Sequence, residues 1–133
     1  MGRLKERGYV LALASSKAES QCVPICRRFG FAPYLTVIAG SSGSRDQSKE
    51  EVIREAMGRL GLADPARAMM VGDRRYDVEG ARACGMDCVG VEFFGYAPPG
   101  ELEEAGAVSV VRTVAELEAF ILRHGAAQAF AGT

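Results

Sequence analysis

Two carboxylates that follow a short apolar run are the residues best placed to do chemistry in this chain. Residues 68–71, Ala-Met-Met-Val, have the apolar character of a buried strand. Gly72 lets the backbone turn sharply, so Asp73 is presented at the carboxyl end of the strand, where open α/β sheets bind their ligands. Asp77 follows four residues later. Taken alone, the two residues also fit a loop carboxylate and a helix N-terminal cap.

A serine pair and a lysine are the other candidates. Ser15 and Ser16 end an apolar run over residues 9–14, and Lys49 opens a segment with helical periodicity. Taken alone, the serines fit a turn or a helix cap, and the lysine fits a solvated surface position. The serines follow a predicted strand, as Asp73 does, and the lysine opens a predicted helix.

The elements that must position these residues alternate between strands and helices. We expect strands over 9–14, 34–39, 68–72, 87–94 and 108–111, and helices over 2–7, 18–29, 49–60, 78–84, 101–105 and 114–123. This alternation predicts an α/β domain with a parallel sheet. Residues 1–124 form one predicted domain, and residues 125–133, small and without periodicity, are predicted to be a flexible tail.

The composition sets limits on the function. The 133 residues are 48% hydrophobic and 25% charged with a formal net charge of -1, which is ordinary for a soluble domain and argues against a nucleic-acid partner. We expect no membrane span and a cytoplasmic location. The cysteines form two Cys-x3-Cys pairs, but their places in a helix and a strand favour buried thiols over a zinc site. His124 is expected at the surface.

In this order, the strand ending in Ser15-Ser16, the helix opened by Lys49 and the Gly-Asp-x-x-x-Asp stretch over 72–77 resemble the motifs of the haloacid dehalogenase (HAD) superfamily of phosphatases. The resemblance covers nearly the whole chain. The Gly/Ser loop over 40–48 and the segments 49–53, 90–96 and 101–107 resemble its phosphoglycolate-phosphatase-like branch. The implied fold is a Rossmann-like three-layer core with a mainly parallel sheet.

The resemblance implies a role for each candidate. The Ser15 hydroxyl and the Ser16 backbone N–H would bind the oxygens of a phosphoryl group, which needs preset donors and cations around it. Lys49 would add a positive charge that also keeps the attacking carboxylate ionised. Asp73 would bind Mg2+, and Asp77 would bind the ion or orient its waters.

Residues 74–76, Arg-Arg-Tyr, lie between the two carboxylates. They fit a solvated loop. The alternative is that they grip substrate or pair with the acids.

The family's first motif, Asp-x-Asp, is absent. The aspartates are Asp46, Asp64, Asp73, Asp77 and Asp87, and no two of them are separated by a single residue. In the family this motif lies on the central strand and supplies the nucleophile and the general acid. We therefore expect the carboxyl-terminal part of a longer phosphatase, without the central strand and without a helical cap. Loss of a central strand leaves backbone groups of its neighbours unpaired, so the sheet must close up, pair with another chain or remain poorly ordered.

Two classes of function remain. The first is a Mg2+-dependent phosphatase that acts on a small phosphorylated metabolite, with its nucleophile encoded upstream or supplied by self-association or a partner chain. The second is an inactive HAD remnant that serves as a binding or interaction module. An upstream reading frame with Asp-x-Asp favours the first, and a true start at Met1 favours the second. A receiver-type signalling domain is a weaker option, because it needs an acidic pair near its first strand.

Overall fold

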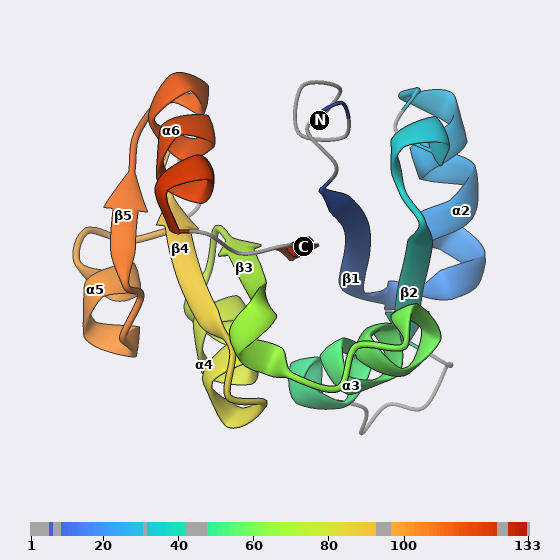
Figure 1. Cartoon of the computed structure of the whole chain (residues 1–133), viewed down its shortest axis with the longest axis horizontal. Helices are drawn as coiled ribbons and strands as arrows, with labels where there is room; N and C mark the ends of the chain where they lie inside the picture. Colours follow the sequence, from blue (N-terminus) through green and yellow to red (C-terminus); the bar gives the residue numbers. More distant parts are fainter. Residues whose placement is uncertain are drawn as a thin grey trace.

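A computed structural model describes residue 6 and residues 9–30, 32–41, 48–92, 97–124 and 128–132. Its described strands form one sheet in the order β2-β1-β6-β3-β4-β5, and every neighbouring pair is parallel. Figure 1 shows β1 and β2 on one side of the molecule and β3, β4 and β5 on the other. The strands are β1 (Val10–Ala18), β2 (Val37–Ser41), β3 (Ala68–Gly72), β4 (Asp87–Val91), β5 (Ser109–Val111) and β6 (Gln128–Gly132). The helices are α2 (Glu19–Arg28), α3 (Lys49–Leu60), α4 (Arg75–Ala83), α5 (Glu101–Ala105) and α6 (Val114–His124), with 3-10 turns at Ala32–Tyr34 and Pro65–Arg67. The predicted α/β fold with a parallel sheet is confirmed.

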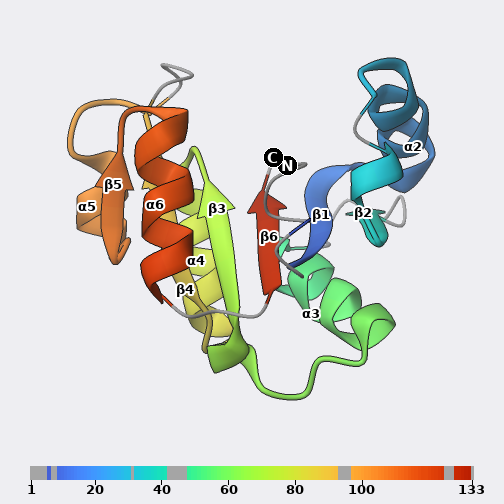
Figure 2. The same ribbon diagram turned by 45° about the horizontal axis from the view of Figure 1, so that its top comes forward.

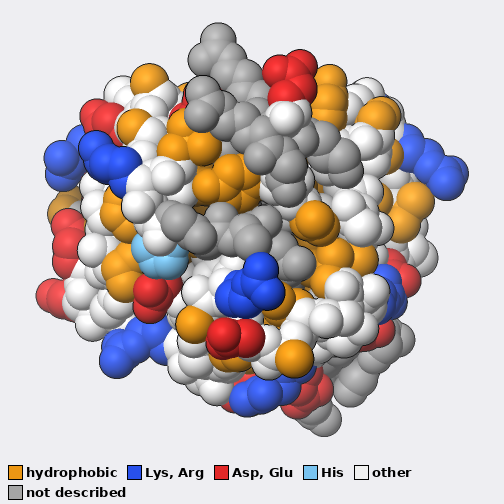
Figure 3. All heavy atoms as spheres, in the orientation of Figure 1, with side chains coloured by type: hydrophobic (Ala, Val, Ile, Leu, Met, Phe, Trp, Pro, Cys, Tyr) orange, Lys and Arg blue, Asp and Glu red, His pale blue; other side chains and the backbone are white. Residues whose placement is uncertain are grey.

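Alternating side chains of the strands build two apolar layers. Met70 and Cys88 pack with α3, α4 and α5 on one face of the sheet, whereas Met69 and Val89 pack with α6 on the other. The helix α2 lies against β1 and β2. On the face seen in Figure 3, hydrophobic side chains gather toward the middle and most charged side chains lie toward the outline. The result is the three-layer arrangement that the resemblance implied.

Helix α3 begins and ends where the sequence predicted. Ser48 caps its start, because the Ser48 hydroxyl accepts a hydrogen bond from the Glu51 backbone N–H at 3.2 Å. Gly61 ends it with a φ of +69°, a left-handed conformation that glycine adopts without strain. These two signals hold Lys49 in the first turn, facing the sheet.

Several boundaries differ from the prediction. Helix α4 begins at Arg75 rather than residue 78, because the Asp77 carboxylate accepts hydrogen bonds from the backbone at the helix start. Strand β2 begins at Val37 rather than residue 34, because Tyr34 is the last residue of a 3-10 turn. Most of the predicted helix over 2–7 and of the loop over 40–48 lies outside the described residues.

The last described segment departs furthest from expectation. Residues 128–132, predicted as part of a flexible tail, form β6 between β1 and β3. The sequence also predicted a sheet without its central strand, whereas in the described sheet β6 takes a central place. Figure 2 shows β6 standing between β1 and β3.

The remaining expectations concern single side chains and the membrane. All four cysteines are buried and free, as predicted. His124 is not a fully exposed residue: its side chain is 21% exposed and its Nε2 lies 3.1 Å from Asp87 Oδ2. No helix in the described ranges has both the length and the apolar character that a membrane span needs.

Candidate functional site

A buried ion pair lies at the carboxyl edge of the sheet. Lys49 Nζ is 2.9 Å from Asp77 Oδ1, with side-chain exposures of 6% and 2%. Lys49 also donates a hydrogen bond to the Ala14 carbonyl of β1 at 3.2 Å. The lysine therefore ties together β1 and the start of α4, and brings a positive charge to the edge where β1 and β3 end.

The second oxygen of Asp77 organises the loop after β3. Asp77 Oδ2 accepts hydrogen bonds from the backbone N–H groups of Asp73 at 3.1 Å and Arg74 at 3.4 Å. The close approach requires Gly72, because a Cβ at this position would overlap the Asp77 side chain. Both oxygens of Asp77 are thus engaged by protein groups.

Asp73 is the more accessible carboxylate of the pair. Its residue is partly exposed, whereas Asp77 is buried. Burial, and secondly the charge of Asp77, raise the pKa of the Asp73 carboxyl above its ordinary value, and Lys49 opposes the shift. A carboxylate in this position, with a second one beside it, suits a hard divalent cation that takes one or two carboxylates and completes its shell with water and phosphate oxygens.

The two predicted serines lie inside β1, in its carboxyl-terminal half, because the strand continues to Ala18 and does not end at the serines as the sequence predicted. Ser15 is buried, and its Oγ accepts a hydrogen bond from the Lys17 backbone N–H at 3.1 Å. Ser16 is exposed. Strand β1 shifts register against β2 between Ala14 and Ala18, so the serines occupy an irregular stretch whose backbone is not used in a regular ladder with β2.

The Arg-Arg-Tyr segment is held by Glu101, the first residue of the 101–107 segment, to which the family resemblance assigned no role. Glu101, at the start of α5, binds the Arg74 guanidinium through both carboxylate oxygens, at 2.8 and 3.1 Å, and also accepts the Arg75 backbone N–H at 3.2 Å. The prediction that this segment pairs with Asp73 or Asp77 was therefore wrong for the bidentate partner of Arg74, which is Glu101. Two sequence signals could have pointed to Glu101: its place at the first position of a helix that follows Gly100, and the resemblance of the 101–107 segment to the phosphoglycolate-phosphatase-like branch.

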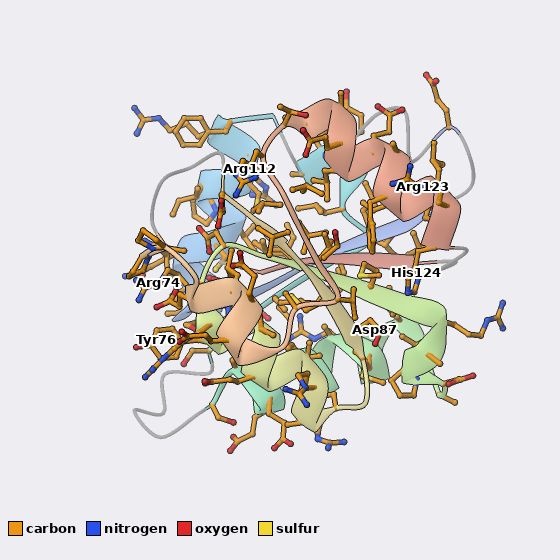
Figure 4. The ribbon with its side chains drawn as sticks, turned by 90° about the vertical axis from the view of Figure 1, so that its left-hand side faces the viewer. Arg74, Tyr76, Asp87, Arg112, Arg123 and His124 are labelled. Atoms are coloured by element: carbon orange, nitrogen blue, oxygen red, sulfur yellow. The ribbon has the colours of Figure 1, made fainter. Side chains whose placement is uncertain are left out.

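Tyr76 is flanked by both arginines. The Arg74 and Arg75 guanidinium carbons lie 5.6 and 5.1 Å from the centre of its ring, which is half exposed. Figure 4 shows Arg74 and Tyr76 at one end of the sheet and Asp87 and His124 at the other. A depression of about 420 Å³ opens next to this segment and is lined by Arg75, Glu79, Pro98, Pro99, Glu101, Glu104 and Ala105.

Comparison with known proteins assigns the sequence to a family. The sequence profile of haloacid dehalogenase-like hydrolases matches residues 1–91. The chain belongs to the haloacid dehalogenase-like hydrolases. The sequence resemblance to this family is confirmed.

Individual relatives of this HAD chain bear different activities in their names. It is 34% identical over 122 residues to a phosphoglycolate phosphatase of Cupriavidus necator, and the aligned residues cover 91% of this chain and 52% of the relative. It is 47% identical over 88 residues to the tyrosine-protein kinase PtkA of Mycobacterium tuberculosis, and the aligned residues cover 65% of this chain and 30% of the relative. The crystal structure of a predicted phosphatase from Clostridium acetobutylicum superposes with a TM-score of 0.86 at 38% identity, covering 92% of this chain and 56% of that one.

The HAD chain therefore spans about half the length of the phosphatases it matches, and less of the kinase. Within that span, the structure brings Lys49, Asp73 and Asp77 together and places the Ser15-Ser16 pair in the carboxyl-terminal half of β1. In the described residues no group of three or more histidine, cysteine or acidic side chains could hold a metal ion by itself. Any cation at this edge would rely on Asp73 with water and phosphate oxygens.

Proposed function

We propose that this chain is the larger part of the catalytic core of a Mg2+-dependent phosphatase that hydrolyses a small phosphate monoester. The observation that carries the proposal is the buried Lys49–Asp77 pair, which holds a positive charge next to the Asp73 loop and the end of β1. A buried ammonium group is costly unless it is paired, so a lysine kept at the ligand-binding edge of a parallel sheet supports an anion-binding role for this edge.

The residues divide the work as follows. Ser15 and Ser16 contribute a hydroxyl and a backbone N–H to the phosphoryl oxygens, and Lys49 contributes charge. Asp73 binds Mg2+, which would neutralise charge on the phosphoryl group when bound. Because both oxygens of Asp77 are engaged, we assign this carboxylate to holding Lys49 and the Asp73 loop, with any metal contact made through water.

The nucleophile comes from outside these 133 residues. No Asp-x-Asp is present in the sequence, and the chain spans about half of its phosphatase relatives. An upstream segment or a partner chain supplies it under this proposal. The four free thiols suit a reducing compartment, which supports a cytoplasmic location.

Two other functions are alternatives to phosphate-ester hydrolysis. An inactive remnant would keep the fold without needing a metal, and the missing motif favours this interpretation. Phosphoryl transfer to a tyrosine hydroxyl is favoured only by the identity to PtkA. Both reactions need the same anion-binding edge, so the acceptor, water or tyrosine, separates them.

Calorimetric titration of the 133-residue chain with Mg2+ tests the proposal, with Asp73→Asn as the variant and Lys17→Met as an exposed control. We expect the parent and Lys17→Met to bind Mg2+ and Asp73→Asn to lose binding. Equal affinity in all three proteins would refute the metal assignment. Hydrolysis of an aryl phosphate by the same proteins completes the test: activity that Asp73→Asn abolishes would show that a nucleophile lies within these residues after all.

A further inference from the structure

The backbone N–H groups that follow β3 are bonded to carboxylates from two elements. Asp77 Oδ2 accepts the N–H groups of Asp73 and Arg74, and Glu101 Oε2 accepts the N–H group of Arg75 at 3.2 Å. Two acids, one in α4 and one in α5, therefore hold three successive residues of the loop. Because these donors are satisfied by protein groups, the loop that carries Asp73 has a fixed course.

Helix α5 brings Glu101 to the loop by packing on β4. Leu102 is buried, and a Cβ on Gly90 would overlap the Leu102 side chain, so the helix lies directly on the strand. Gly90 is the register partner of Gly72, the residue before Asp73. The packing of α5 therefore places Glu101 next to the segment that presents Asp73.

Arg74 brings a positive charge next to the proposed metal ligand. It directly follows Asp73 in the chain. The hydrogen bond from Arg74 to Glu101 raises the pKa of the guanidinium, and the charge of Asp73 adds to the rise, so the two side chains are close enough to interact. A guanidinium that is free to pair with Asp73 would repel a divalent cation and compete with it for the carboxylate.

Glu101 has the geometry to neutralise this charge. Its two oxygens accept hydrogen bonds from Arg74 Nε and Nη2 at 2.8 and 3.1 Å, the bidentate arrangement that matches a guanidinium. The bond to Arg74 holds the pKa of the Glu101 carboxyl below its ordinary value, so this acid is ionised at neutral pH. The guanidinium carbon also lies 5.6 Å from the centre of the Tyr76 ring, so Arg74 has two contacts apart from Asp73.

We propose that Glu101 is a positioning residue of the site, which binds the Arg74 guanidinium so that the Asp73 carboxylate stays free to bind a cation. This proposal rests on the proposed function, and adds to it a residue that acts through Arg74. Its effect comes from the charge that it neutralises, and not from the bond alone. Variants that break the bond from its two sides should therefore have different effects on cation binding.

Calorimetric titration of the 133-residue chain with Mg2+ tests this difference. Glu101→Gln leaves the Arg74 charge without its partner, and should weaken Mg2+ binding about tenfold. Arg74→Met breaks the same bond but removes the positive charge, so its affinity should equal or exceed that of the parent. The double variant should bind Mg2+ within about twofold of the parent. Equal weakening in both single variants would show that the bond is only structural and would overturn the proposal, and so would a measurable but equal affinity in all four proteins.

Arg82→Met is the matched control. Arg82 donates a hydrogen bond from Nη1 to the Ala105 carbonyl at 3.0 Å, so it ties α4 to the opposite end of α5. This variant also removes an arginine bond to α5, and it should bind Mg2+ as the parent does. A loss as large as that in Glu101→Gln would mean that any loosening of α5 weakens the site, which would overturn the proposal.

Urea denaturation of the metal-free chain gives a second measurement that does not depend on Mg2+. In the parent, the effects of Asp73→Asn and Arg74→Met on the unfolding equilibrium should nearly add. In the Glu101→Gln background the freed guanidinium pairs with Asp73, so the same two changes should depart from additivity by at least about threefold in the equilibrium constant. Additivity in both backgrounds would overturn the proposal. If the coupling appears only with Glu101→Gln and none of the proteins binds Mg2+, the role of Glu101 stands and the metal assignment in the proposed function fails.

Discussion

Replacement of Lys49 by methionine removes the charge at the centre of the site while keeping an unbranched apolar chain of similar length. The variant leaves the Asp77 carboxylate, whose side chain is 2% exposed, without its partner at 2.9 Å. It also removes the hydrogen bond from Lys49 to the Ala14 carbonyl. We therefore expect Lys49→Met to lower the free energy of unfolding by a large amount, although Lys49 lies at a ligand-binding edge.

The size of the effect follows from the geometry. At 2.9 Å and an effective dielectric constant of about 20, the attraction of two unit charges is about 6 kcal/mol. Desolvation of both groups offsets much of this in the intact pair, but removal of one partner leaves the other charge buried, which typically lowers the free energy of unfolding by about 3–5 kcal/mol. A domain of this kind has about 5–15 kcal/mol in total, so the variant should be folded but weakened, or close to unfolding.

Urea denaturation at pH 7 measures the change. Lys17→Met makes the same replacement at an exposed position of β1 and should change the free energy of unfolding by less than about 0.5 kcal/mol. The double variant Lys49→Met, Asp77→Asn removes both charges, and it should lose much less than the sum of the two single losses. A loss below about 1 kcal/mol for Lys49→Met, or strict additivity in the double variant, would show that the pair does not act as a buried ion pair.

Three further predictions concern the same edge and the core. Gly72→Ala should lower the free energy of unfolding by about 1–3 kcal/mol because its Cβ would overlap the Asp77 side chain. Gly58→Ala, in a helix with open space around the new methyl group, should raise the free energy of unfolding by about 0.5–1 kcal/mol. Urea denaturation that finds Gly72→Ala more stable than Gly58→Ala would contradict the packing. Because the pKa of Asp73 is raised in the folded state, the native protein binds more protons than the unfolded chain from about pH 3.8 up to that raised pKa, so stability without metal should fall as pH rises through this window. The fall should be absent in Asp73→Asn, and identical pH profiles would refute the shift. Burial raises the pKa of the Cys88 thiol, so it should react with a thiol reagent at pH 8 only as fast as the protein opens; rapid labelling in the native state would contradict its burial.

The sequence was a good guide wherever a local signal decided the structure. Ser48, Lys49 and Gly61 fix the start and end of α3 by capping and by a left-handed glycine, and the predicted helix coincides with the observed one. The apolar run before Gly72 became β3 with Asp73 at its carboxyl end. These features depend on neighbours within a few residues, so periodicity and turn chemistry suffice to predict them.

The sequence was a poor guide where a residue's partner comes from another element. One oxygen of Asp77 contacts Lys49, which lies far away in the sequence, and the other accepts hydrogen bonds from the amides that precede α4. The carboxylate that the sequence predicted to bind a metal ion or orient its waters therefore holds the loop. The bidentate contact of Glu101 with Arg74 joins α5 to the same loop across 27 residues. Neither contact has a periodic signature, because packing of helices on the sheet decides it.

Strand β6 shows why composition alone could not predict the tail. The segment has weak strand propensity, and in isolation it would favour disorder. In the sheet, however, a vacant central position leaves two rows of backbone groups unpaired, and even a poor strand that satisfies them is favoured over none.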